Sequence, residues 1–278
     1  MRCIFCKQNS SSCRSTEHIV PEALGNIGWT LPPGIVCDAC NNYFALKVEK
    51  PLLDSGRFKN LRARQDIPNK KGFSPPIEGV LQGTNINLSM QLGKESVRVH
   101  GLWPTHERDS PRFVDHIRQS NSGTLIFPLS LPVNGQLLSR LLAKIALEAF
   151  VERIYRVAGW EESAIDDPQL DPIRRFARRG DQPSRWPYHE RRIYAEDSKF
   201  IGEDGKEYQT VHEADFLYTT ENELYSVNCI FGIEYAINLG GPEIAGYEKW
   251  LKANNYTSPL YVKPHSESGH PTEIEPKS

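Results

Sequence analysis

Two Cys-x-x-Cys pairs constrain the fold of this 278-residue chain more than any other feature. Five of the six cysteines lie in the first forty residues, and thirty residues separate the two pairs. Two residues between cysteines allow both sulfurs to turn toward one ion, and two such turns complete a tetrahedral set suited to zinc. The spacing therefore predicts a structural zinc ion on Cys3, Cys6, Cys37 and Cys40, and Cys13 is expected to be a partly buried free thiol.

A disulfide framework is the alternative use of such cysteines, and it requires an oxidising compartment. The N-terminal sequence MRCIFCKQNSSSC lacks the apolar region of a signal peptide. No apolar run in the chain approaches the length that crosses a bilayer. We therefore expect a cytoplasmic protein with no membrane association and with reduced cysteines.

The formal net charge of −2 is unevenly distributed along the chain. Residues 1–72 hold 11 basic and 6 acidic side chains, a net +5, and the remainder carries −7. Between the two parts, the sequence QDIPNKKGFSPP is rich in residues that discourage regular structure. This pattern predicts a small basic module at 1–64, a linker at 65–77, a larger domain at 78–262 and a polar tail at 263–278.

The candidate catalytic residues lie between the two cysteine pairs and directly after the second pair. They include Glu17-His18-Ile19-Val20-Pro21, and Asn41 directly follows the last cysteine. In order and spacing, this pattern resembles the HNH endonuclease superfamily, whose ββα-metal module holds an acidic–His–Ile–x–Pro motif between two cysteine knuckles. The resemblance covers about residues 3–53.

The resemblance implies a role for each residue of the motif. His18 would be the general base, because imidazole titrates near neutral pH. Glu17 and Asn41 would bind a catalytic Mg²⁺ or Mn²⁺ ion through oxygen, and the zinc would be structural. The implied activity is hydrolysis of phosphodiester bonds in DNA, in a microbial restriction or antiphage defence system. A non-catalytic zinc ribbon that binds nucleic acid or a partner protein is the alternative.

One position departs from the family pattern. Many HNH proteins carry a middle Asn about five residues before the third cysteine, where this chain has Leu31-Pro32-Pro33. No amide is available there to brace the loop that bears the histidine. Asn26 or Thr30 could supply the brace.

A helix is expected to start at Asn41, with Phe44, Val48 and Leu52 as its apolar stripe. Pro51 should end or kink this helix. The basic side chains on and after it are candidate phosphate contacts, with a solvated surface as the equally weighted alternative; they are Lys47, Lys50, Arg57 and Arg62.

The larger domain reads as α+β, so the fold class predicted for the chain is a zinc-stabilised ββα module followed by an α+β domain. The best helix is 136–157, whose apolar residues recur at helical spacing. Alternation of polar and apolar residues predicts a strand at 85–92, and 96–100 is expected to pair with it as a hairpin. A further strand or edge segment is expected at 124–129, and strands at 208–218 and 223–239, the last rich in Ile, Tyr and Val. Substrate recognition, regulation and homo-oligomer formation are the roles considered for this domain.

Residues 174–192 form a second basic cluster, with seven arginines and three interleaved aromatic side chains. In one interpretation, the arginines bind phosphates and the aromatic rings stack on bases. In the other, slightly favoured, the arginines pair with the acidic run 161–171 and the rings enter the core.

Overall fold

The computed structural model describes residues 1–26, 28–65, 67–68, 73–92, 99–120, 122–127, 131–158, 162–195, 198–201, 207–209 and 212–261. The chain divides into two compact units, one formed by residues 1–20, 26–49 and 135–278 and the other by residues 21–25 and 50–134. The predicted tail at 263–278 and part of the predicted linker lie outside the described residues. The domain boundaries expected from the sequence stay a prediction.

The first unit begins with a hairpin and a helix, in the order ββα. Strands β1 (Glu17–His18) and β2 (Thr30–Leu31) pair antiparallel, with Glu17 opposite Leu31 and His18 opposite Thr30. Helix α1 (Asp38–Phe44) follows. It begins at Asp38 rather than at Asn41, because the Cys37 sulfur accepts a hydrogen bond from the Cys40 backbone N–H and so caps the helix three residues earlier than predicted.

The helix continues through a π-helical segment η2 (Ala45–Glu49) and ends, in the second unit, with α2 (Lys50–Leu53). The π segment lies before Pro51, whose ring and missing N–H disturb the regular α-helical hydrogen-bond ladder. Phe44, Val48 and Leu52 are fully buried, which confirms the predicted stripe.

A four-stranded antiparallel sheet forms the centre of the first unit, in the order β10-β11-β12-β7. Its strands are β7 (Tyr188–Arg192), β10 (Glu213–Tyr218), β11 (Leu224–Ile230) and β12 (Ile233–Asn238). The segment predicted as strand at 223–239 folds as a hairpin, because Phe231 and Gly232 adopt positive φ angles of 52° and 75° and reverse the chain. The predicted strand at 208–218 divides between β9 (Glu207–Gln209) and β10, with 210–211 outside the described residues.

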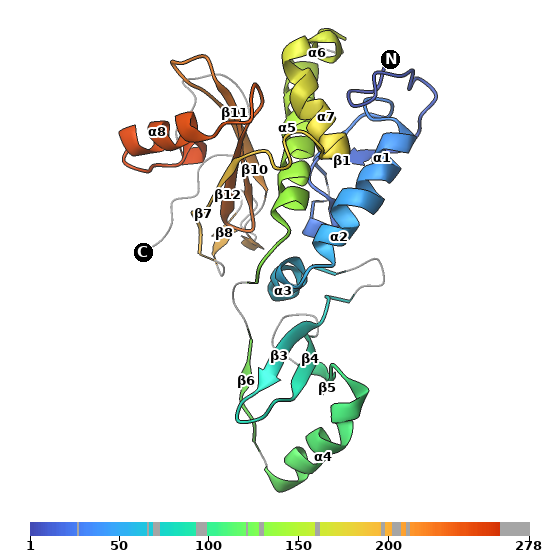
Figure 1. Ribbon diagram of the computed structural model, residues 1–278, viewed down its shortest axis with the longest axis vertical. Coiled ribbons are helices and arrows are strands. Elements are labelled where there is room, and N and C mark those ends of the chain that lie inside the picture. Colours follow the sequence, from blue (N-terminus) through green and yellow to red (C-terminus); the bar gives the residue numbers. More distant parts are fainter. Residues whose placement is uncertain are drawn as a thin grey trace. The chain divides into compact units, whose positions relative to one another are not determined.

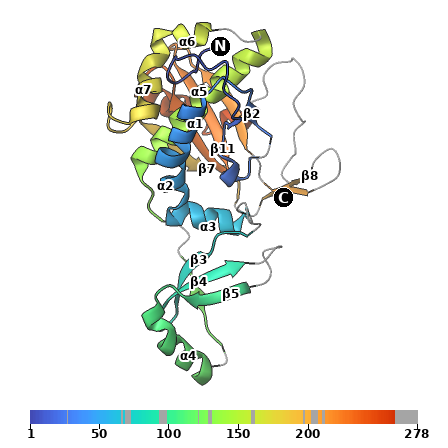
Figure 2. The same cartoon turned by 90° about the vertical axis from the view of Figure 1, so that its right-hand side faces the viewer.

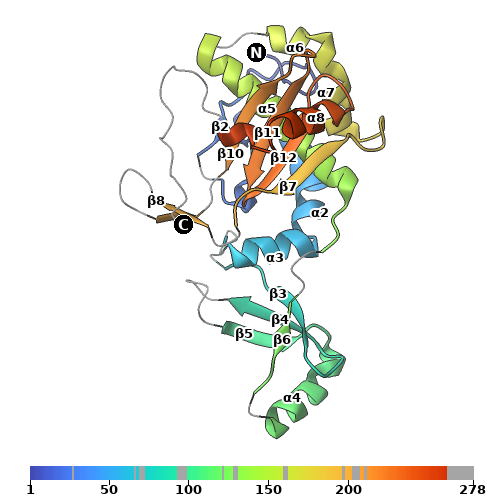
Figure 3. The same ribbon diagram turned by 90° about the vertical axis from the view of Figure 1, so that its left-hand side faces the viewer.

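Two helices cover opposite faces of this sheet, as Figures 1 and 3 show. Tyr247 and Leu251 of α8 (Ala245–Ala253) pack against Tyr225 and Val227 of β11. On the other face lies α5 (Gly135–Ala158), whose Phe150 ring contacts Phe216 of β10 at 5.9 Å between centroids. A sheet backed by one long helix was predicted, and the fold class is α+β as expected.

Further short elements complete the first unit. Helix α6 (Ser163–Asp166) and the 3₁₀ turn η4 (Pro168–Leu170) lead into α7 (Asp171–Arg179), which packs against α5. Strand β8 (Lys199–Ile201) pairs with β9, and the turn η5 (Pro259–Tyr261) follows α8.

The second unit contains its own antiparallel sheet, in the order β5-β4-β3-β6. Figure 2 shows β3, β4 and β5 side by side. The strands are β3 (Ile77–Leu81), β4 (Asn87–Leu92), β5 (Val99–Pro104) and β6 (Leu125–Ile126). The strand predicted at 85–92 is present as β4, and β3 was not predicted. The predictions at 96–100 and 124–129 overlap β5 and β6, with 96–98 and 128–129 outside the described residues. The helical elements are η1 (Glu22–Leu24), α3 (Gly56–Arg64), η3 (Glu107–Asp109) and α4 (Ser110–Gln119). Within the described ranges of both units, no helix is long and apolar enough to cross a membrane.

Candidate active site and metal centre

The four cysteines of the two Cys-x-x-Cys pairs gather at one point. The sulfur atoms of Cys3, Cys6, Cys37 and Cys40 all lie within 4.8 Å of one another, and three of the four residues are buried. Backbone N–H groups point at the sulfurs, with Cys37 N at 3.3 Å from Cys3 Sγ and Cys40 N at 3.4 Å from Cys37 Sγ. Four thiol groups in this arrangement suit tetrahedral zinc. Cys13 is partly buried and is not part of the cluster, as predicted.

The thiol groups of the cluster differ in proton affinity. A hydrogen bond from the Cys40 thiol lowers the pKa of Cys3 to about 4, whereas burial raises the pKa of Cys37 and the hydrogen bond to Cys3 raises the pKa of Cys40. The thiolate is the form of cysteine that binds zinc. The donor set, its burial and its compactness therefore fit the predicted structural zinc.

Glu17 and His18 occupy β1, between the two cysteine pairs in sequence, and their environments differ. Glu17 is only 5% exposed, and its Oε2 atom has no hydrogen-bond partner among the described residues. Burial raises the pKa of Glu17, while the neighbouring Lys144 opposes this shift. His18 is partly exposed, and its Nδ1 atom is buried without a hydrogen-bond partner in the described part of the chain.

Asn41 lies in α1, with its side chain directed back toward the hairpin. Its Nδ2 atom is 3.4 Å from the backbone carbonyl oxygen of Thr16, the residue before Glu17. The helix and the hairpin therefore bring Asn41 close to the strand that carries Glu17 and His18. These are the three residues that the motif singled out.

The brace expected from Asn26 or Thr30 takes a different form. Asn26 is buried, and its amide donates to the carbonyl oxygens of Val20 and Trp29 while its oxygen accepts from the Trp29 N–H. Asn26 thus fixes the loop between the strands, not the imidazole. Thr30 is the cross-strand neighbour of His18, but no hydrogen bond joins their side chains among the described residues.

The sequence reasoning missed a buried ion cluster at this site. Lys144 of α5 is 0% exposed, and its Nζ atom lies 2.5 Å from Glu17 Oε1, 3.2 Å from Glu49 Oε1 and 3.1 Å from Glu148 Oε2. It also donates to the carbonyl oxygen of His18 at 2.9 Å. A signal was present: Lys144 and Glu148 are spaced i,i+4 inside the otherwise apolar run LLAKIALEAF.

The cluster raises the pKa of its basic and acidic members alike, for different physical reasons. Burial alone would lower the pKa of Lys144, but the negative charges of Glu148, Glu49 and Glu17 outweigh it and raise that pKa. Lys144 is therefore a charged ammonium. Burial raises the pKa of Glu148 well above its usual range.

The four basic side chains proposed as phosphate contacts are spread over both units. Lys47 is exposed on η2 in the first unit. The other three belong to the second unit: Lys50 pairs with Asp54 at 2.9 Å, Arg57 lies at the start of α3, and Arg62 is half-buried. Burial lowers the pKa of Arg62. Their contact with substrate stays a prediction.

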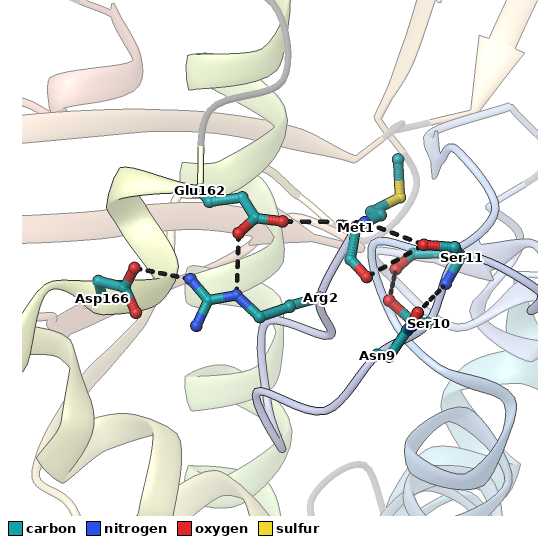
Figure 4. Close-up of polar contacts among 8 residues, drawn as sticks. Met1, Arg2, Asn9, Ser10, Ser11, Glu162 and Asp166 are labelled. Carbon is teal, nitrogen blue, oxygen red and sulfur yellow. Dashed lines mark hydrogen bonds and ion pairs between the residues drawn. The ribbon is translucent and has the colours of Figure 1, made fainter.

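The arginine cluster at 174–192 follows neither interpretation completely. Phe176 and Trp186 are fully buried and contact each other at 5.6 Å, so these rings belong to the core and do not stack on bases. The acidic run pairs mainly with the N-terminal segment: Arg2 donates to Glu162 at 2.9 Å and to Asp166 at 2.6 Å (Figure 4). Lys7 pairs with Asp171 at 2.7 Å, and Arg174 also contacts Asp171.

Comparison with known proteins agrees with this geometry. A family model described as HNH endonuclease matches residues 3–55, the segment that contains the cysteine cluster, β1, β2 and α1. The N-terminal part of the chain is therefore an HNH endonuclease module. Searches of curated proteins and of solved structures gave no match.

Proposed function

We propose that this protein is a metal-dependent endonuclease that hydrolyses phosphodiester bonds in DNA. The observation that carries the proposal is the convergence of three residues inside the matched segment. Glu17 and His18 are adjacent on β1, and the Asn41 amide contacts the backbone of Thr16 immediately before them. Acidic, imidazole and amide groups on one hairpin and one helix are the set that the HNH motif uses.

The residues present fit a divalent cation. Mg²⁺ prefers oxygen ligands and keeps several waters, so few protein ligands suffice. Glu17 Oε2 is a buried carboxylate oxygen without a hydrogen-bond partner among the described residues, and Asn41 supplies an amide oxygen on the neighbouring helix. A bound Mg²⁺ or Mn²⁺ would neutralise charge on the scissile phosphate.

His18 is the general base in this proposal. Its imidazole is partly exposed, so a water molecule can reach it, and the fixed strand pairing with Thr30 holds its backbone. Removal of a proton from that water produces the nucleophile that attacks phosphorus. The zinc expected on the cysteine cluster would be structural, because it would hold the start of α1 against the Cys3–Cys6 pair. The cluster takes no part in the chemistry.

A basic cavity in the same unit supports a nucleic-acid substrate. The cavity has a volume of about 550 Å³ and lies between α7 and the first cysteine knuckle, next to Cys6. Arg175 and Arg179 are exposed there and Arg178 is partly exposed. Arginine side chains in such a cavity suit phosphate groups of a polyanion. Arg174 is different, because it is buried and donates to the backbone carbonyl oxygens of Ile4 and Ala164.

The test is cleavage of plasmid DNA in Mg²⁺ or Mn²⁺ by the full-length protein and by His18→Ala. Loss of the general base should lower kcat by about 10²–10⁴-fold. His106→Ala is the matched control, because His106 is exposed in the second unit and should leave activity unchanged. Equal activity of the wild type and His18→Ala would contradict the proposal. Parallel assays on single-stranded DNA and RNA define the substrate.

The second candidate is a zinc protein that binds nucleic acid without cleaving it. The observation in its favour is the burial of Glu17, whose Oε1 atom pairs with Lys144 and whose Oε2 atom is also buried. DNA binding without cleavage under any metal condition would favour this candidate. A role in restriction or antiphage defence, a cytoplasmic location and a homo-oligomer stay predictions from the sequence.

A further inference from the structure

Lys144 is a fully buried lysine that contacts both members of the Glu17–His18 pair. Its ammonium group binds the carboxylate of Glu17 at 2.5 Å and the backbone carbonyl oxygen of His18 at 2.9 Å. No other described residue is shown to contact both of them in this way. The lysine comes from the long helix α5, 126 residues from His18 in the sequence.

Stability alone does not account for a lysine at this place. Desolvation of an ammonium and of carboxylates is costly, and a buried ion pair replaced by apolar side chains often leaves stability unchanged or improves it. Here one ammonium faces three carboxyl groups, Glu17, Glu49 and Glu148, which is more than one ion pair requires. A buried charge cluster beside a reactive pair is more often found at functional sites than elsewhere.

The contacts have a clear mechanical effect on β1. The strand is only two residues long and pairs with an equally short β2, so its own hydrogen bonds fix it weakly. Lys144 adds one ion pair to the Glu17 side chain and one hydrogen bond to the His18 backbone. Together they fix both the direction of the Glu17 carboxylate and the position of the His18 main chain.

The two carboxylate oxygens of Glu17 have different environments. Oε1 is held by Lys144, whereas Oε2 is without a hydrogen-bond partner among the described residues. A carboxylate oxygen that is fixed in position and has no hydrogen-bond partner is suited to bind a cation. In metal sites, the ligands are oriented by neighbouring groups, and Lys144 would orient Glu17 in this way. The middle Asn that braces many HNH sites is replaced here by Leu31-Pro32-Pro33, and Lys144 lies where a brace is needed.

We infer that Lys144 is a positioning residue of the nuclease site, which holds the Glu17 carboxylate and the His18 backbone in the geometry required for cation binding and water activation. The inference rests on the proposed function, because it assigns Lys144 to that same site. It makes helix α5 a component of the active site, so the segment matched to the HNH family is not the complete catalytic unit.

The experiment separates positioning from charge balance. Lys144→Met removes the ammonium but keeps the length of the side chain. It also removes the counter-charge of three carboxyl groups. The double variant Lys144→Met/Glu148→Gln removes one carboxyl group as well, so its formal net charge equals that of the wild-type cluster. Glu148→Gln is the matched control, because Glu148 contacts Lys144 but no group of the reacting pair.

The readouts are kcat and KM for plasmid cleavage, Mn²⁺ affinity by electron paramagnetic resonance, and zinc content as a measure of folding. In the double variant, zinc content should equal that of the wild type, kcat should fall about 10²-fold, and Mn²⁺ affinity should fall about 10–100-fold. The KM for DNA should change less than threefold. Glu148→Gln should retain kcat and Mn²⁺ affinity within threefold.

A purely structural role of Lys144 predicts the opposite pattern. The double variant would then recover wild-type kcat and Mn²⁺ affinity, and that result would overturn the inference. If the wild type cleaves no substrate, the proposed function fails, and the Mn²⁺ titration still decides the role of Lys144. In that case, equal Mn²⁺ binding by the wild type and the double variant, or none by either, overturns the inference too.

A second control uses another buried cation of the same unit. Arg174 is 4% exposed and bonds to backbone carbonyl oxygens and to Asp171, away from β1. Arg174→Met should lower the melting temperature without the specific loss of Mn²⁺ affinity. The same loss of Mn²⁺ affinity in Arg174→Met would show that any buried charge deletion has this effect, and would contradict the inference.

Discussion

Two clusters of buried polar side chains hold the HNH module, and they differ in origin. The cysteine cluster takes all four members from the first forty residues, at one end of α1. The lysine cluster joins β1 and the Glu49 end of the same helical segment to α5. One cluster is a local metal site, and the other is a set of ion pairs between distant parts of the chain.

The difference shows which part of the site each cluster controls. The cysteine sulfurs contact one another and nearby backbone N–H groups, so they fix the start of α1. Lys144 contacts the candidate metal ligand and the residue that carries the candidate base. The cysteine cluster therefore determines whether the module folds, and the lysine cluster determines how its reacting groups are directed.

The largest expected effect comes from loss of the metal cluster. Structural zinc contributes about 10–16 kcal/mol of apparent binding free energy in zinc-finger peptides. Cys40→Ser removes a buried ligand, so we expect loss of the zinc ion and unfolding of the module, measured by metal analysis and circular dichroism. Cys13→Ser is the matched control and should keep one zinc ion per chain. A Cys40→Ser protein with full zinc content and an unchanged melting curve would refute the four-thiolate site.

The next effect compares two members of the lysine cluster. Lys144→Met should lower the free energy of unfolding by about 3–5 kcal/mol, because it leaves buried carboxylates without a counter-charge. Glu148→Gln should leave stability unchanged or increase it, since it removes one of the three carboxyl groups that face a single ammonium. Urea unfolding of both variants measures the difference. Equal destabilisation by the two changes would show that packing, not charge, dominates the cluster.

A smaller effect is expected at the neutral hydrogen bonds of the same hairpin. Asn26→Ala removes three buried hydrogen bonds to the backbone of Val20 and Trp29. At about 1 kcal/mol each, the free energy of unfolding should fall by about 2–3 kcal/mol. Urea unfolding checks the value, and zinc content should be unaffected. Loss of zinc in Asn26→Ala would mean that the two clusters are coupled through the loop.

The smallest effect is expected at an exposed ion pair outside both clusters. Lys50 and Asp54 are spaced i,i+4 and are mostly exposed to solvent. Lys50→Ala should change the free energy of unfolding by no more than about 0.5 kcal/mol, and less at high salt. Thermal unfolding at two salt concentrations measures it. A larger or salt-independent loss would show that Lys50 has a structural role that its exposure does not suggest.

Local patterns predicted several parts of the fold correctly. The apolar periodicity at 136–157 predicted α5 to within two residues, and period-two alternation predicted β4. Errors occurred where a local detail overrode the pattern. The Cys37 sulfur starts α1 before Asn41, and the positive φ angles of Phe231 and Gly232 divide a predicted strand into a hairpin.

The sequence by itself determined the candidate zinc ligands and the candidate reacting residues, because spacing and adjacent motif letters encode contacts between near neighbours. Cys3, Cys6, Cys37 and Cys40 come together as their spacing required. The tertiary structure alone decided that Lys144 meets Glu17 and His18. An ion pair between segments more than a hundred residues apart leaves no periodic pattern. It exists only because packing of α5 against the module excludes water and brings the charges together.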